Sequence, residues 1–95
     1  MKLAPGILAT LALATPLKAE DLTIGFAIAK SGWMEAYDTP AAAAAKLRID
    51  EINAAGGLLG RQIKVVEADT RTDRAESAKA GLDVLDQGAE MMVVS

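Results

Sequence analysis

Three residues in one short segment are suited to contact a small solute. Ser31 carries a hydroxyl that can donate or accept a hydrogen bond, and Trp33 and Tyr37 carry two of the three aromatic rings in this 95-residue sequence. Such rings can enclose an apolar side chain or lie over an ammonium group. We therefore expect Tyr37, Trp33 and Ser31 to contact a ligand, with Tyr37 as the leading candidate. The alternative roles are a domain interface or packing of the loop for the rings, and stabilisation of a turn for the hydroxyl.

The side chains most often used in catalysis and metal binding are missing from the sequence. It contains no cysteine and no histidine. A cysteine nucleophile, a thiolate metal site and a disulfide framework are therefore excluded, and so is the commonest general base. We expect a protein that is not an enzyme and that has no cofactor and no metal.

Asp69 suggests a different interpretation, because an acidic residue at the end of a second strand binds ribose in dinucleotide enzymes. The first loop, however, lacks the required G-x-G-x-x-G pattern, and Glu35 and Asp38 would repel a pyrophosphate. The glycines within residues 56–60 follow a helix rather than a first strand. We interpret Asp69 as a strand-end cap or turn acceptor, and Asp69 with Asp73 as solvated carboxylates rather than a cation site.

A strand over residues 22–29 precedes the candidate ligand contacts. Its large apolar residues alternate with small ones, so neither face is polar, and this pattern is typical of a central parallel strand covered on both sides. We expect a loop over residues 30–38. Thr39 and Pro40 then predict a helix start, with a hydroxyl cap followed by a proline at the first helical position. The large residues of the strand are Leu22, Ile24, Phe26 and Ile28.

Two glycines predict the end of this first helix. Gly56 and Gly57 accept the left-handed backbone conformation that a helix C-terminus favours. A second strand is predicted over residues 63–69. The inner stripe of the helix is predicted from residues three or four positions apart: Ala41, Ala45, Ile49 and Ile52.

A second helix is predicted after the second strand. Asp73 and Glu76 have the spacing of a capping box, and Gly88 ends the helix. An apolar run over residues 91–94 then begins a third strand. The predicted inner stripe of the second helix is Ala75, Ala78, Leu82 and Leu85.

The order strand, helix, strand, helix, strand predicts an α/β fold with a doubly wound parallel sheet. Right-handed crossovers give the strand order 2-1-3. In such sheets the ligand lies at the carboxyl ends of the strands where the order reverses, here beside residues 30–38 and Ser95. Such a sheet leaves apolar faces and edges uncovered, so we expect residues 20–95 to be the first βαβαβ portion of a larger domain.

Residues 1–19 have the layout of a secretory signal peptide. Lys2 and Lys18 flank an apolar run over residues 7–14, and this leader contains no acidic residue. The run is too short to span a bilayer, and a small residue precedes the expected cleavage after Ala19.

The remainder of the chain is acidic. It holds all 13 acidic residues and eight of the ten basic ones, so its formal charge is 8 − 13 = −5. We therefore expect no nucleic-acid partner. No second apolar segment is long enough to cross a membrane, so we expect an exported product without stable membrane insertion.

Three stretches of sequence carry a family resemblance. LTIGFAIAKSG at residues 22–32 resembles the first strand and serine-glycine loop of type I periplasmic binding proteins, particularly the branched-chain amino acid (leucine-binding-protein-like) group of ABC importers. DEINAAGGLLGRQIKVVEADTRTDRAESA resembles the helix end, glycine turn, second strand and acidic cap of that group, and DQGAEMMVVS resembles the approach to its third strand. The likeness covers nearly all of residues 22–95 in the same order.

The resemblance implies the N-terminal part of a two-lobe protein that binds an amino acid or related small solute in the periplasm and delivers it to an ABC transporter permease. Counted without gaps from Ser31, Tyr37 falls where the branched-chain group has a pocket tyrosine. The resemblance also implies that the main carboxylate contacts come from the loop after the third strand and that other contacts come from a second lobe, both beyond Ser95. A ligand-sensing receptor ectodomain of the same fold and a nucleotide-dependent α/β enzyme stay open as alternatives.

Overall fold

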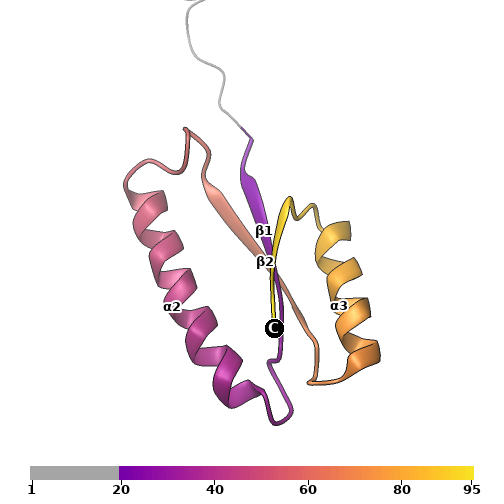
Figure 1. Cartoon of the computed structure of the whole chain (residues 1–95). Helices are drawn as coiled ribbons and strands as arrows, with labels where there is room; N and C mark the ends of the chain where they lie inside the picture. Colours follow the sequence, from indigo (N-terminus) through magenta and orange to yellow (C-terminus); the bar gives the residue numbers. More distant parts are fainter. Residues whose placement is uncertain (1–19) are drawn as a thin grey trace, which may run out of the picture.

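A computed structural model describes residues 20–95, and the signal peptide predicted for residues 1–19 lies outside them. Three strands alternate with two helices along the described chain (Figure 1). In chain order the elements are β1 (Leu22–Ile28), α2 (Glu35–Ala54), β2 (Ile63–Asp69), α3 (Arg74–Asp86) and β3 (Met91–Val94).

The three strands form one parallel sheet in the order β2-β1-β3, which confirms the predicted order 2-1-3. β1 pairs with β2 along its whole length, from Leu22 opposite Ile63 to Ile28 opposite Asp69. β3 pairs with the other edge of β1. The carboxyl ends of all three strands therefore point to the same end of the molecule (Figure 1).

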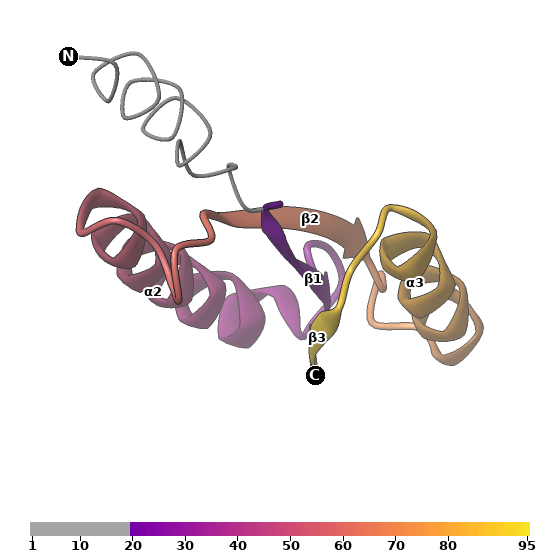
Figure 2. The same cartoon turned by 90° about the horizontal axis from the view of Figure 1, so that it is seen from above.

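The two helices cover opposite faces of the sheet (Figure 2). On the α2 face, Phe26 is almost completely buried in a cluster of large apolar side chains. Full burial of one such ring stabilises the fold by about 2–3 kcal/mol. The buried members of this cluster are Leu22, Phe26, Ile28, Ala42, Ile49 and Ile63. The predicted stripe of α2 is therefore confirmed at the buried Ile49 and at Ala45 and Ile52, which are partly buried against the cluster. It is wrong at Ala41, which is exposed, while Ala42 is buried.

On the other face, α3 lies very close to β1. A Cβ atom added to Gly25 would lie 2.6 Å from the Cβ of Val84, so this approach requires glycine. The predicted inner stripe of α3 is wrong at all four residues, because Ala75 and Ala78 are exposed, Leu82 is 63% exposed and Leu85 is 49% exposed. Val84, with Ala80, is buried instead. Smaller side chains fit between a helix and a strand that approach so closely, and the leucines do not.

The start of α2 also differs from the prediction. The helix begins at Glu35, so residues 35–38 are helical rather than part of a loop, and Pro40 lies inside the helix. A proline at this position removes one helical N–H donor, and its ring crowds the carbonyl of Ala36 four residues earlier. Glu35 and Asp38 place negative charge in the first turn, where the helix dipole favours it. The extra turn places Tyr37 on the helix.

The predicted helix ends and the second helix start agree with the structure. Gly56 and Gly57, with φ angles of 111° and 89°, follow the end of α2, and Gly88, with φ of 93°, follows α3. The Asp73 side chain accepts a 2.9 Å hydrogen bond from the Glu76 N–H and so caps α3. The ends of both helices and the start of α3 therefore follow the local signals of the sequence.

The edge strand β3 is exposed along its whole length. Its four residues are all apolar, which agrees with the expectation that this sheet leaves apolar edges uncovered. Within residues 20–95, neither helix combines the length and the apolar character needed to cross a bilayer.

Candidate ligand-binding crevice

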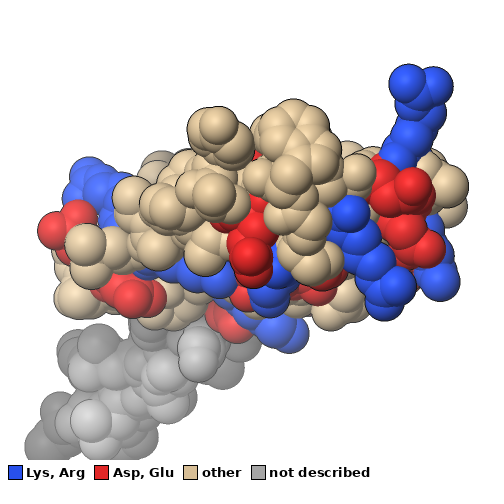
Figure 3. All heavy atoms as spheres, turned by 90° about the horizontal axis from the view of Figure 1, so that it is seen from below, with Lys and Arg blue, Asp and Glu red and all other residues tan. Residues whose placement is uncertain are grey.

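The carboxyl ends of the strands meet the starts of both helices at one end of the molecule. Figure 3 views this end, where uncharged side chains cover the middle of the face and carboxylates lie between them. The segment after β1 and the turn after β2 are both part of this end. Because the strand order reverses between β1 and β3, this is the position at which open α/β sheets bind ligands.

Asp69, the last residue of β2, holds the segment that follows β1. Its Oδ2 accepts a 2.7 Å hydrogen bond from the Ser31 hydroxyl. Its Oδ1 accepts 2.8 Å hydrogen bonds from the N–H groups of Lys30 and Arg71. The interpretation of Asp69 as a strand-end cap and turn acceptor is therefore confirmed.

These contacts set the ionisation of Asp69. The loss of hydration at this position by itself raises the pKa of the carboxyl. The hydrogen bonds from Ser31, Arg71 and Lys30 act in the opposite direction, together with the charge of Arg71. The balance lowers the pKa of Asp69 below its ordinary value of 3.8, because every one of these partners favours the carboxylate.

Thr72 adds a second connection between the same two segments. Its hydroxyl donates a 2.8 Å hydrogen bond to the carbonyl of Ser31 and accepts one of 3.3 Å from the N–H of Met34. Gly32 has a φ of 83°, and a Cβ added there would lie 2.6 Å from the Thr72 hydroxyl oxygen. The residues after β1 are therefore held tightly against the turn after β2. The sequence analysis did not find Thr72, because this contact spans 41 residues.

The three predicted ligand contacts lie at this end of the molecule. The Ser31 hydroxyl donates to Asp69, which is the turn-stabilising role named as its alternative, and its oxygen lone pairs remain able to accept. The rings of Trp33 and Tyr37 are 74% and 68% exposed. Both rings are thus accessible to a ligand or to another protein surface. Ligand contact by these three residues stays a prediction.

Asp38 is a buried carboxylate that the sequence analysis did not select. Its residue is only 8% exposed, although it lies in the first turn of α2. Its Oδ2 accepts a 2.8 Å hydrogen bond from the Ala29 N–H, just after β1. The same oxygen accepts a hydrogen bond from the Ser95 hydroxyl, just after β3. Asp38 therefore connects the ends of the two strands between which the crevice lies.

Two hollows adjoin this connection. One has a volume of about 130 Å³ and lies between α2 and β3, with a mainly apolar lining that includes Phe26, Val93 and Asp38. The other has a volume of about 310 Å³ and lies at the start of α3. Its lining is Ala29, Met34, Thr70, Thr72, Asp73, Arg74, Ser77 and Ser95. Hydroxyl groups dominate the polar part of this second hollow, and hydroxyls suit hydrogen bonding of a small polar solute.

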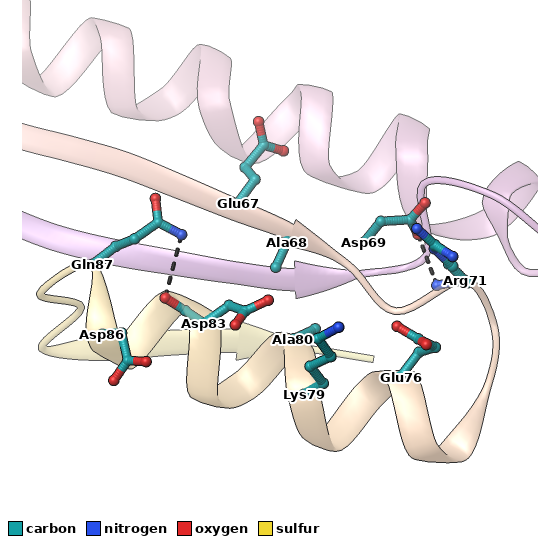
Figure 4. Close-up of a pocket in the computed structure, with 10 residues that line it drawn as sticks. All are labelled: Glu67, Ala68, Asp69, Arg71, Glu76, Lys79, Ala80, Asp83, Asp86 and Gln87. Carbon is teal, nitrogen blue, oxygen red and sulfur yellow. Dashed lines mark hydrogen bonds between the residues drawn. The ribbon is translucent and has the colours of Figure 1, made fainter.

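A further groove of about 490 Å³ runs along the outer side of the sheet, between β2 and α3 (Figure 4). Most of its charged side chains are carboxylates on α3 and β2, and Gln87 donates a 3.3 Å hydrogen bond to the Asp83 carbonyl. In the described part of the chain, no three acidic side chains are grouped so that they could hold a metal ion.

Comparison with known proteins supports the predicted family. Residues 21–95 match the family described as periplasmic binding protein. A Leu/Ile/Val-binding protein of Rhizobium johnstonii is 32% identical over 87 residues, which are 92% of this chain and 23% of that protein.

A solved structure agrees with the fold. It is the branched-chain amino acid transporter substrate binding protein LivJ from Streptococcus pneumoniae in complex with isoleucine, with a TM-score of 0.66 and 42% sequence identity. The match covers 70% of this chain and 19% of that one. The chain thus spans about a fifth of the length of these two relatives. Because the family match extends over residues 21–95 and the sheet has the expected order, this chain belongs to the periplasmic binding protein family.

Proposed function

We propose that this chain forms part of the N-terminal lobe of an exported, non-enzymatic substrate-binding protein. The complete protein binds an amino acid or related small solute, of the branched-chain type, in the periplasm. It then delivers the solute to the permease of an ABC transporter. The leader predicted for residues 1–19 directs its export.

One observation carries this proposal. Over the 70% of this chain that the match covers, 42% of the residues are identical to those of a transporter substrate-binding protein whose structure contains isoleucine. The geometry of the crevice is consistent with that role, since hydroxyl groups and two exposed rings lie at the carboxyl ends of β1 and β2. Hydroxyls and N–H groups are suited to a carboxylate, and the rings to an apolar side chain.

Isothermal titration calorimetry tests the binding role. The complete mature protein that carries residues 20–95 is titrated with branched-chain, basic and acidic L-amino acids and with their amides. We expect saturable binding of at least one amino acid at one site per molecule. Absence of heat with every solute in the panel, from protein that unfolds cooperatively, would contradict the proposal.

The delivery role needs a separate measurement. Cells that lack the gene should take up the bound solute more slowly from dilute medium, and expression of the complete protein should restore uptake. Unchanged uptake together with tight binding in vitro would instead favour a ligand-sensing ectodomain of the same fold.

A further inference from the structure

We propose that Asp38 is a specificity residue of the crevice, and that its carboxylate binds a positively charged nitrogen of the ligand, an ammonium or guanidinium group. This inference rests on the proposed function, because it concerns the same solute site. It assigns a ligand group to the carboxylate oxygen Oδ1, since the hydrogen bonds within the fold end on Oδ2.

The position of Asp38 is the first argument. The Ala29 N–H lies just past the end of β1, and Ser95 lies just past the end of β3. Asp38 accepts hydrogen bonds from both, so its carboxylate lies directly at the reversal of the strand order. Solutes bound by open α/β sheets lie at this point.

The charge of Asp38 is the second argument. The residue is 8% exposed, and none of the four ion pairs found among residues 20–95 includes it. A buried carboxylate is costly unless hydrogen bonds or an opposite charge compensate for its lost hydration. The two donors and the start of α2 supply part of this compensation. A ligand cation would supply the rest.

The third argument concerns Oδ1, the other oxygen of the Asp38 carboxylate. Both hydrogen bonds end on Oδ2, and Oδ1 accepts none from the described residues. Within that same part of the chain, no fully buried side-chain oxygen lacks a partner, so Oδ1 keeps some access to its surroundings. Asp38 also lines the 130 Å³ hollow between α2 and β3. One acceptor atom thus remains for a nitrogen donor, and it would repel a carboxylate.

Asp38→Asn in the complete protein is the test, because asparagine has almost the same shape and can still accept from the Ala29 N–H. Calorimetry compares L-isoleucine, L-lysine and L-arginine with matched compounds that lack one charged group. The alkylamines lack the carboxylate, and the alkanoic acids lack the amine. We expect Asp38→Asn to weaken binding of the tightest amino acid by about 10- to 100-fold. Binding of the alkanoic acids should stay the same or strengthen.

Glu35→Gln serves as the control variant, because glutamine has nearly the same size as glutamate and carries no charge. It removes one negative charge from the same helical turn, at an exposed position. Equal affinity of Asp38→Asn and the wild type for the amino acid would overturn the inference and leave the proposed function intact. Equal losses in Asp38→Asn and Glu35→Gln would also overturn it, because they would indicate a general effect of charge.

The wild-type protein provides a second measurement that does not depend on the folding of any variant. A preference for alkylamines over alkanoic acids supports the inference, and the reverse preference overturns it. Binding of alkylamines without any amino acid would support the inference while contradicting the proposed function. Absence of binding by every compound would contradict both.

Discussion

The Ser31 hydroxyl donates a 2.7 Å hydrogen bond to Asp69 Oδ2 across 38 residues of sequence. This bond connects the segment after β1 to the last residue of β2, so the two segments that border the crevice hold each other in place. Thr72 strengthens the connection through the Ser31 carbonyl. The crevice rim is therefore fixed by Asp69 at the end of β2 and by side chains of the two segments that follow β1 and β2.

Asp69→Asn should reduce stability most at neutral pH. The pKa of Asp69 is lowered in the folded state, so the ionised carboxylate contributes stability above its unfolded pKa of about 3.8. That contribution is lost as the pH falls from 3.8 through the lower folded pKa. Urea unfolding of the wild type and Asp69→Asn across this range should show the difference in unfolding free energy shrinking toward zero.

Asp86→Asn is the control for this pH series. Asp86 is exposed, and the structure gives its side chain no hydrogen bond among residues 20–95. The control should match the wild type at neutral pH. A difference between wild type and Asp69→Asn that stays constant into acid would rule out the carboxylate as its source.

The central strand and the sheet order could be predicted because they depend on local patterns. Alternating large and small residues in β1 indicated cover on both faces, and both faces are covered. The start of α2 was predicted too late in the sequence, because Thr39 and Pro40 have the pattern of a helix start although they lie inside the helix. The first turn of α2 contains Asp38, which accepts a hydrogen bond from the Ala29 N–H. This bond joins residues nine apart, so no periodic pattern in the sequence indicates it.

The inner stripe of α3 was missed for a tertiary reason. Leucines are the most apolar residues of that helix, so periodicity favours them. The contact distance, however, is set by Gly25 on β1, which admits Val84 and excludes larger side chains.

Gly25→Ala should destabilise the protein by about 1–3 kcal/mol, the usual cost of overpacking. The added Cβ would lie 2.6 Å from the Val84 Cβ and 2.9 Å from that of Ala89, so α3 must move away from β1. Chemical denaturation measures the loss. Gly81→Ala is the matched control, since a Cβ there meets nothing within 4 Å. It should stabilise α3 by about 0.5–1 kcal/mol. Similar effects of both changes would exclude close packing as the cause.

The exported protein should begin at Glu20. The leader predicts cleavage after Ala19, and Arg61 donates hydrogen bonds of 2.9 Å and 3.1 Å to the carbonyls of Glu20 and Asp21. Arg61 thus holds the first two residues that follow the predicted cleavage point. Intact-mass measurement of protein purified from the periplasm checks this. A mature protein that retains residues 1–19 would contradict the predicted export signal.

Tyr37→Ala should weaken ligand binding without reducing stability. The ring is exposed on the first turn of α2 at the crevice end, so its removal leaves no cavity in the core. Exposed tyrosines at binding sites often contribute about 1.4 kcal/mol or more, which corresponds to a tenfold change in affinity. Calorimetry and thermal unfolding of the complete protein measure the two effects separately.

Leu47→Ala is the control for this prediction. It removes an exposed apolar side chain from the same helix, farther from the crevice, and should change neither affinity nor stability. If Tyr37→Ala binds as tightly as Leu47→Ala, the tyrosine serves a surface other than the solute site.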